Sequence, residues 1–167
     1  MKLFKLTTLT LFSVLLYNYT ISQNILINVL TQNAGVVRMG ESGKIEIKIC
    51  NTSSVLAVPA YKIRPQISIP LSLVNIPDSG HVLPEGWSII SKSDGVFRLT
   101  NGTDQISPND CRTILLTFTG VSKGGPFTVS GNILFSNGLF PGNTSGPPTQ
   151  GDNPADNSSS STCEVIK

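Results

Sequence analysis

Hydrophobic and polar side chains alternate with a period of two along several short segments of the chain. The clearest case is 44–50, where Ile45, Ile47 and Ile49 alternate with Lys, Glu and Cys. Successive side chains of a strand point to opposite faces, so this pattern predicts a strand with one face in a core and the other in solvent. No stretch shows a convincing helical period. We therefore expect the fold to be built from strands.

Other segments carry the same alternation or a high content of β-branched residues, and Gly, Pro, Asn and Asp separate them. They are residues 25–31, 63–69, 87–91, 96–100, 113–119, 127–135 and 161–167. The tetrapeptide 92–95 (KSDG) predicts a hairpin. Pro65 predicts an edge position or a bend in its strand, and Gly131 predicts a bulge or a close approach of the backbone. Seven or eight antiparallel strands without a helix predict a two-sheet sandwich, with a closed barrel as the alternative.

The first 22 residues predict a secretory signal peptide. Lys2 and Lys5 form a positive start, residues 6–17 are largely apolar, and 20–22 (TIS) supply the small residues that signal peptidase reads, so we expect cleavage before Gln23. The apolar run is too short for a membrane anchor. The expected product is one domain, 23–167, that is secreted or held at the cell surface, with no transmembrane segment after signal removal. Within it, residues 137–160 are rich in Gly, Pro, Ser and Asn and predict a flexible loop.

Charge argues against nucleic acid as a partner. Once the two lysines of the signal peptide are removed, ten basic and ten acidic residues remain, so the mature chain has no net charge. No basic cluster of the kind that binds phosphate backbones is present.

Four stretches resemble the immunoglobulin-like repeat domains of bacterial, Bacteroidetes-type, cell-surface and secreted proteins. They are 40–52 (GESGKIEIKICNT), 83–87 (LPEGW), 99–103 (LTNGT) and 152–158 (DNPADNS). The resemblance spans roughly residues 24–167. It implies an immunoglobulin-like sandwich that acts as a spacer, adhesive module or surface-assembly unit, and not as an enzyme. The chain departs from the repeat pattern because it carries a single copy.

No catalytic or metal site is predicted, and no cofactor. His81 is the only histidine, and it lies in a turn-rich segment that predicts a solvated loop. Two carboxylate pairs, Asp104 with Asp110 and Asp152 with Asp156, are conceivable calcium ligands, but Asx-turns explain them more simply. Tyr61, in a loop next to proline, is a candidate ligand contact.

Within the expected mature chain, 23–167, four Asn-x-Ser/Thr triplets begin at residues 51, 101, 143 and 157. In a bacterium they are expected to be unmodified turns, and only a eukaryotic secretory pathway would glycosylate them.

The three cysteines allow three single pairings, each of which leaves one thiol. Cys50 and Cys111 have the parity of outward-facing residues on strands that are commonly antiparallel neighbours in an immunoglobulin-like sandwich. We expect these two to be paired and Cys163 to be a buried thiol. Three unpaired thiols are the alternative.

These features support two hypotheses about function. The first is a non-catalytic interaction or adhesion module that binds an unknown protein or glycan at the cell envelope through its loops. The second is a self-assembling fibre or surface-layer subunit, in which residues 23–31 add to the sheet edge of a neighbour.

Overall fold

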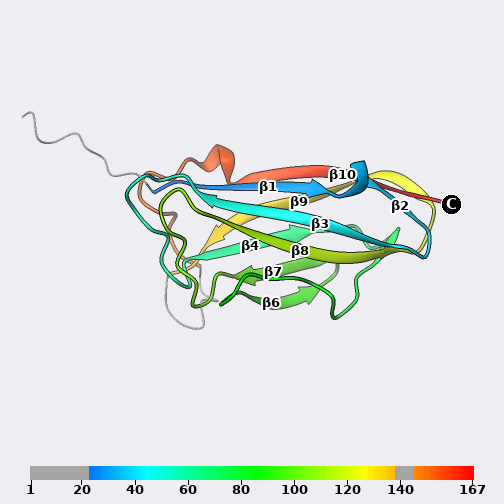
Figure 1. Cartoon of the computed structure of the whole chain (residues 1–167), viewed down its shortest axis with the longest axis horizontal. Helices are drawn as coiled ribbons and strands as arrows, with labels where there is room; N and C mark the ends of the chain where they lie inside the picture. Colours follow the sequence, from blue (N-terminus) through cyan, green and yellow to red (C-terminus); the bar gives the residue numbers. More distant parts are fainter. Residues whose placement is uncertain (1–22, 138–144) are drawn as a thin grey trace, which may run out of the picture.

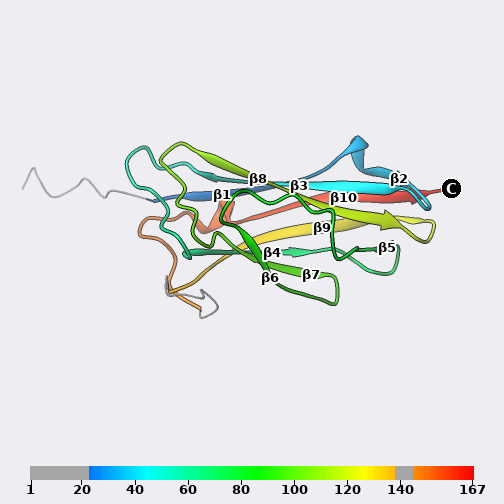
Figure 2. The same cartoon turned by 60° about the horizontal axis from the view of Figure 1, so that its bottom comes forward.

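The strands form two sheets that pack face to face. The structure is a computed structural model that describes residues 23–137 and 145–167. One sheet has the order β1-β3-β8-β5, and the other has the order β2-β10-β9-β4-β7-β6. Figures 1 and 2 show the two layers from two sides. The predicted signal peptide lies outside the described residues.

The ten strands of the described residues are β1 (Ile25–Thr31), β2 (Val36–Arg38), β3 (Ser42–Asn51), β4 (Ile63–Ser68), β5 (Val74–Asn75), β6 (Ser88–Ser93), β7 (Val96–Thr100), β8 (Cys111–Gly120), β9 (Gly124–Phe135) and β10 (Ser158–Ile166). Two short 3₁₀ turns, η1 (Asn33–Gly35) and η2 (Pro154–Asp156), complete the secondary structure.

The predicted all-β, immunoglobulin-like sandwich is confirmed. The order of the smaller sheet follows the A-B-E-D order of immunoglobulin sheets. The structure has more strands than the seven or eight predicted, because β2 and β5 are too short to show a periodic pattern. It is also not wholly antiparallel, since β2 runs parallel to β10.

Three local predictions can be compared directly with the structure. Asp94 and Gly95 have positive φ angles between β6 and β7, which is the backbone of a tight hairpin, as predicted. Pro65 was expected at an edge or a bend, but β4 is an interior strand. The missing N–H is tolerated because the ladder between β4 and β7 begins only at Gln66. Finally, β10 begins at Ser158, three residues before the expected start.

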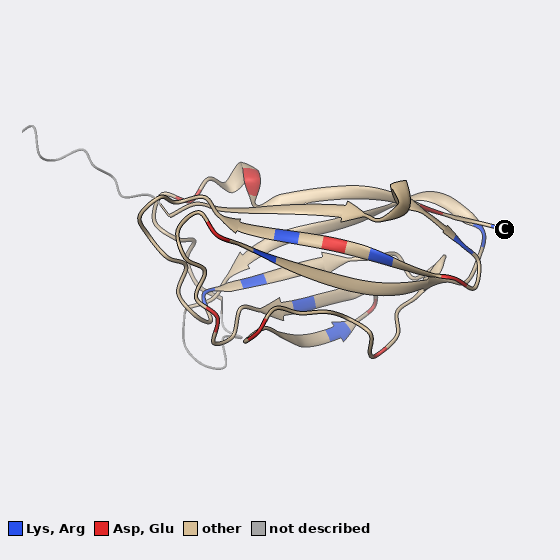
Figure 3. Ribbon diagram, in the orientation of Figure 1, with Lys and Arg blue, Asp and Glu red and all other residues tan. Residues whose placement is uncertain are grey.

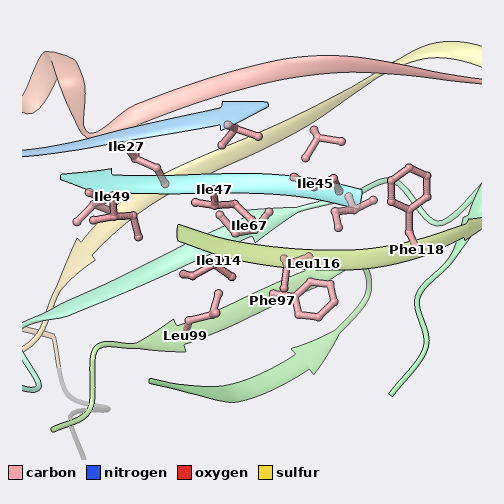
Figure 4. Packing of buried hydrophobic residues seen from close by; sticks show 14 of the residues in the cluster. Ile27, Ile45, Ile47, Ile49, Ile67, Phe97, Leu99, Ile114, Leu116 and Phe118 are labelled. Atoms are coloured by element: carbon pink, nitrogen blue, oxygen red, sulfur yellow. The ribbon is translucent and has the colours of Figure 1, made fainter. Parts of the chain in front are cut away.

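The core lies between the sheets and consists mostly of alternate residues of the long strands. Ile45, Ile47 and Ile49 of β3 are fully buried, as their spacing predicts. They face Ile67, Phe97 and other residues of the larger sheet (Figure 4). Burial of one such side chain contributes about 1.5–3 kcal/mol, so this alternation is the main local determinant of which face each strand turns inward.

The seam between β1 and β10 joins the two sheets along one side (Figure 1). The Val29 amide donates to Ser159 Oγ at 3.0 Å, and Thr31 Oγ1 donates to the Thr162 carbonyl at 2.8 Å. Thr31 Oγ1 also lies 3.1 Å from Ser161 Oγ. The Ser159 side chain of β10 thus satisfies the Val29 amide of β1, and the Thr31 side chain of β1 bonds β10 in turn.

At Gly131 the backbone of β9 lies close to side chains of β1, and a side chain there should destabilise the fold. A Cβ atom at this position would lie 2.6 Å from Val29 Cγ2 and 3.0 Å from Ile27 Cδ1. We expect Gly131→Ala to lower the free energy of unfolding by about 1–3 kcal/mol, as overpacked cores do. Urea denaturation tests this, with Ser130→Ala on the outward side of the same strand as the control. Equal stability of the two variants would contradict the close approach.

Candidate functional site

A row of polar side chains crosses the outer face of the six-stranded sheet. Strand register places Asn132 of β9 opposite Ser158 of β10 on one side and Gln66 of β4 on the other. Gln66 lies opposite Arg98 of β7, which in turn lies opposite Ser91 of β6. Paired residues of neighbouring strands point to the same face, so five strands contribute one continuous polar row.

Two adjoining hollows lie over this face, with volumes of about 360 and 410 Å³. The first extends over Gln66 and Asn132, and the second extends over Arg64. Both share Leu134, which is 46% exposed, and Asn157. We call these hollows together the groove. It is defined by Arg64, Gln66, Asn132, Leu134, Pro154 and Asn157.

The wall of the groove is the chain that returns to β10, and hydrogen bonds hold it against the N-terminal segment. The Ile25 amide donates to Asp152 Oδ1 at 3.0 Å, and Asn24 Nδ2 donates to Asp156 Oδ2 at 2.9 Å. The Asn157 side chain donates to Asp152 Oδ2 at 2.5 Å.

Asp152 and Asp156, which were considered as calcium ligands, therefore serve as hydrogen-bond acceptors that position the wall. Of the predicted flexible loop 137–160, residues 138–144 lie outside the described residues, and Asp152, Asp156 and Asn157 are anchored in this way.

Basic side chains are concentrated on this face. Arg64 lines the groove, and Arg98 lies opposite Gln66 one strand away. Lys62 precedes β4 and donates to the Pro147 carbonyl at 2.9 Å. Figure 3 shows these basic positions on β4 and β7, whereas β3 on the other sheet alternates basic and acidic positions.

The other carboxylate pair belongs to a compact polar cluster at one end of the sandwich. Arg112 donates to both oxygens of Asp104, at 2.8 and 3.0 Å, and to Asp110 Oδ2 at 2.6 Å. Trp87 Nε1 donates to Asp104 Oδ2 at 2.6 Å. Hydrogen bonding to the two carboxylates raises the pKa of Arg112, and its guanidinium lowers the pKa of Asp110. Asp104 and Asp110 are thus engaged in ion pairs that stabilise the fold.

His81 is half-buried, so the expectation of a solvated loop histidine is wrong. Its Nδ1 accepts the Thr117 amide of β8 at 3.1 Å, and Nε2 lies 3.1 Å from the Pro77 carbonyl. The ring packs edge-on against buried Phe97, with 5.2 Å between ring centroids. The turn residues around His81 fold against the edge of β8 beyond its pairing with β5, where Val82 bridges Leu115, and the local sequence does not reveal this. Both ring nitrogens face main-chain groups.

Acid should weaken the domain through His81. Burial is the largest effect and lowers its pKa below the ordinary value of about 6.5, although the hydrogen bond to Pro77 acts in the opposite direction. Nearby Lys92 lowers the pKa further, and Asp78 raises it. Because the folded-state pKa is the lower one, the unfolded chain binds the proton first. The contribution of neutral His81 to the free energy of unfolding is therefore complete above about pH 6.5, and it is lost as pH falls through the folded-state pKa of His81.

This dependence can be measured as the free energy of unfolding between about pH 5 and 7. His81→Asn is the matched variant, since its amide oxygen can accept the Thr117 amide without titrating. The pKa of Asp78 is lowered chiefly by Lys92, so its contribution is lost only below its ordinary value, outside this range. We expect the parent domain to lose stability on acidification and the variant to lose less. Equal slopes of the free energy of unfolding against pH in the two proteins would contradict the assignment of this effect to His81.

Tyr61 does not line the groove. It has a φ angle of 56°, its amide donates to the Gly102 carbonyl at 2.8 Å, and its carbonyl accepts the Ser136 hydroxyl. The residue is half-buried at the turn that leads into β4. A role as a ligand contact stays a prediction.

The structure joins Cys50 and Cys111 by a disulfide at the last register pair of β3 and β8. Their Cα atoms are 4.1 Å apart. Cys163 is buried as a free thiol on β10, and its burial raises its pKa.

Two of the glycosylation triplets begin at asparagines that are inaccessible. Asn51 is 1% exposed, and Nδ2 donates to the carbonyls of Leu56, Ile106 and Ser107. Asn101 is fully buried and bonded in a similar way. Glycosylation at either position would require loss of these bonds. Asn143 lies outside the described residues, and Asn157 is half-buried at the groove wall.

Sequence reasoning did not find the residues of the groove. Gln66, Asn132 and Asn157 are ordinary polar residues of strands and turns when read along the chain. The available signal was the run of outward Ser, Thr, Asn and Gln residues in the segments that form β4, β9 and β10. It became informative only once the strands were paired.

Comparisons with known proteins support the fold. No known protein family matches the chain, and no curated protein matches it. A CARDB domain from Pyrococcus furiosus, solved in complex with di-metal ions, is 11% identical, with a TM-score of 0.52 over 87% of this chain and 90% of that one. A cohesin module from a Clostridium perfringens family 33 glycoside hydrolase is 11% identical, with a TM-score of 0.54 over 85% of this chain and 98% of that one.

At this identity the likeness shows a shared fold: the chain has an immunoglobulin-like β-sandwich domain. Within residues 23–137 and 145–167, no helix is long and apolar enough to cross a membrane. In the same part of the chain, no three His, Cys, Asp or Glu side chains gather in a way that could hold a metal ion.

Proposed function

We propose that this chain is an exported, non-catalytic interaction module that binds its partner on the outer face of the six-stranded sheet. The groove is the observation that carries the proposal, because it combines a concave surface, an exposed apolar floor at Leu134 and amide side chains from three segments. Sites of this composition are typical of ligand recognition. The engagement of both ring nitrogens of His81 by main-chain groups argues against its use as a general base.

The proposed setting is the cell envelope of a bacterium, where the domain is secreted or held at the surface. The predicted signal peptide and the resemblance to bacterial surface repeats support this setting. The partner is a protein or a glycan. In this arrangement the sandwich provides a rigid frame, and the wall of the groove is the loop that confers specificity.

Binding to native cell envelopes tests the proposal. We expect the double variant Gln66→Ala/Asn132→Ala to bind at least about tenfold more weakly, since two hydrogen-bonding side chains are lost. The matched control is Asn75→Ala/Thr113→Ala on the four-stranded sheet, which should bind as the parent does. Equal binding of all three proteins would remove the groove from the proposal. Hydrolytic turnover that is abolished by His81→Ala would contradict the non-catalytic role.

Self-assembly through the N-terminal segment is the second candidate. In the structure, residues 25–31 pair with β3 over their full length, and side chains of β10 bond their other edge. Strand donation would have to break both sets of contacts. Electron microscopy and sedimentation at high protein concentration distinguish the two candidates, since fibres support assembly and a monomer argues against it.

A further inference from the structure

We infer that the groove binds an acidic polysaccharide that lies across strands β10, β9, β4 and β7. This inference rests on the proposed function, because it names the class of ligand for the same face. It draws on three observations: the local charge, the spacing of the polar row, and the obstructed edges at β6, β2 and β1.

The local charge favours an anionic ligand. The lining of the groove contains Arg64 and no carboxylate, and Arg98 lies beside it at the next position of the polar row. The two carboxylates of the wall, Asp152 and Asp156, are turned to the N-terminal segment and accept hydrogen bonds there. On β3 of the other sheet, by contrast, Glu46 lies between Lys44 and Lys48.

The polar row favours a ligand rich in hydroxyl groups. Neighbouring strands are about 4.8 Å apart, so a chain that crosses them meets a new amide, hydroxyl or guanidinium group at each such step. Gln66 and Asn132 can both donate and accept hydrogen bonds, as sugar hydroxyls do. Leu134 and Pro154 provide apolar surface on which the C–H face of a sugar ring can pack. A polysaccharide with a carboxylate on its rings can pair with the arginines, exchange hydrogen bonds with the amide side chains, and pack on the apolar surface.

The sheet edges argue against an extended peptide, which would bind by adding a strand. The outer edge of β6 has a bulge between Ile89 and Ser91. Its Lys92 donates to the carbonyls of Ile76 and Pro77 at 3.3 Å, which ties this edge to the segment that follows β5. Bulges and inward-turned lysines are devices that prevent strand pairing. At the other side, β10 covers β1, and β2 is only three residues long.

The test is affinity electrophoresis and calorimetry with polygalacturonate, its fully methyl-esterified form and a poly-aspartate peptide as probes. We expect polygalacturonate to bind, the neutral ester to bind at least about tenfold more weakly, and binding to weaken with added salt. Arg64→Gln and Arg98→Gln should each lower the affinity by about fivefold or more, the effect of a lost charge-assisted hydrogen bond. Lys44→Gln and Lys48→Gln, on the outer face of the other sheet, should leave it unchanged. A thermal melt of each variant verifies that it is folded.

The possible failures are distinguishable. Equal binding of the acid and the ester, lowered by Gln66→Ala/Asn132→Ala but not by the arginine variants, would overturn the acidic ligand and retain the groove as an interaction site. Preference for poly-aspartate would overturn the polysaccharide. If the envelope-binding activity of the domain is insensitive to every variant on this face, both the inference and the proposed site are overturned.

Discussion

Replacing Asn101 by alanine is expected to destabilise the domain by about 3 kcal/mol or more, because the buried Ile63 amide and two partly buried main-chain carbonyls lose their hydrogen-bond partner. Asn101 is fully buried directly after β7. Its Oδ1 accepts the Ile63 amide at 3.1 Å, and Nδ2 donates to the carbonyls of Pro59 and Asp104 at 2.8 and 2.7 Å. One side chain thereby connects the start of β4 with the loop that precedes it and with the loop between β7 and β8. Water cannot replace the bond to the buried Ile63 amide without entering the core.

Urea denaturation followed by the fluorescence of Trp87, the only tryptophan, measures this effect. The matched control is Asn75→Ala, at an exposed position of β5, and it should change the free energy of unfolding by less than about 0.5 kcal/mol. A loss below about 1 kcal/mol for Asn101→Ala would show that the pocket is wet or that the loops rearrange.

Removing the disulfide should have an effect of similar size. Cys50 and Cys111 are 61 residues apart, so their bond restricts a long loop of the unfolded chain. Loss of that restriction should lower the free energy of unfolding by about 2–4 kcal/mol in the double variant Cys50→Ala/Cys111→Ala. Exported proteins meet an oxidising environment, where such a bond persists. Reductant should destabilise the parent protein and leave the double variant unaffected.

A thiol titration of the unfolded, unreduced protein provides the direct check. We expect one reactive thiol, and peptide mapping should place it at Cys163. Three thiols would contradict the bridge. The control is Cys163→Ala, which should abolish the titration while the protein keeps its sensitivity to reductant.

The sequence by itself determined the features that depend on near neighbours. The alternation in 44–50 identified Ile45, Ile47 and Ile49 as inward-pointing, because alternate residues of a strand share one face and the apolar face is the one that is buried. The hairpin at Asp94 and Gly95 followed from turn chemistry, which depends on two adjacent residues. The all-β sandwich followed from the sum of such segments. Prediction was least accurate for β2 and β5, since two or three residues carry no period.

Tertiary structure alone decided which distant residues meet. Gln66, Asn132, Ser158 and Arg98 form one row because of strand register, which is set by pairing between segments far apart in the sequence. The environment of His81 depends on a turn that docks on β8. The groove exists because the chain before β10 bonds to the N-terminal segment more than 100 residues away. Such contacts follow from packing of the whole chain, and a local pattern of residue types does not encode them.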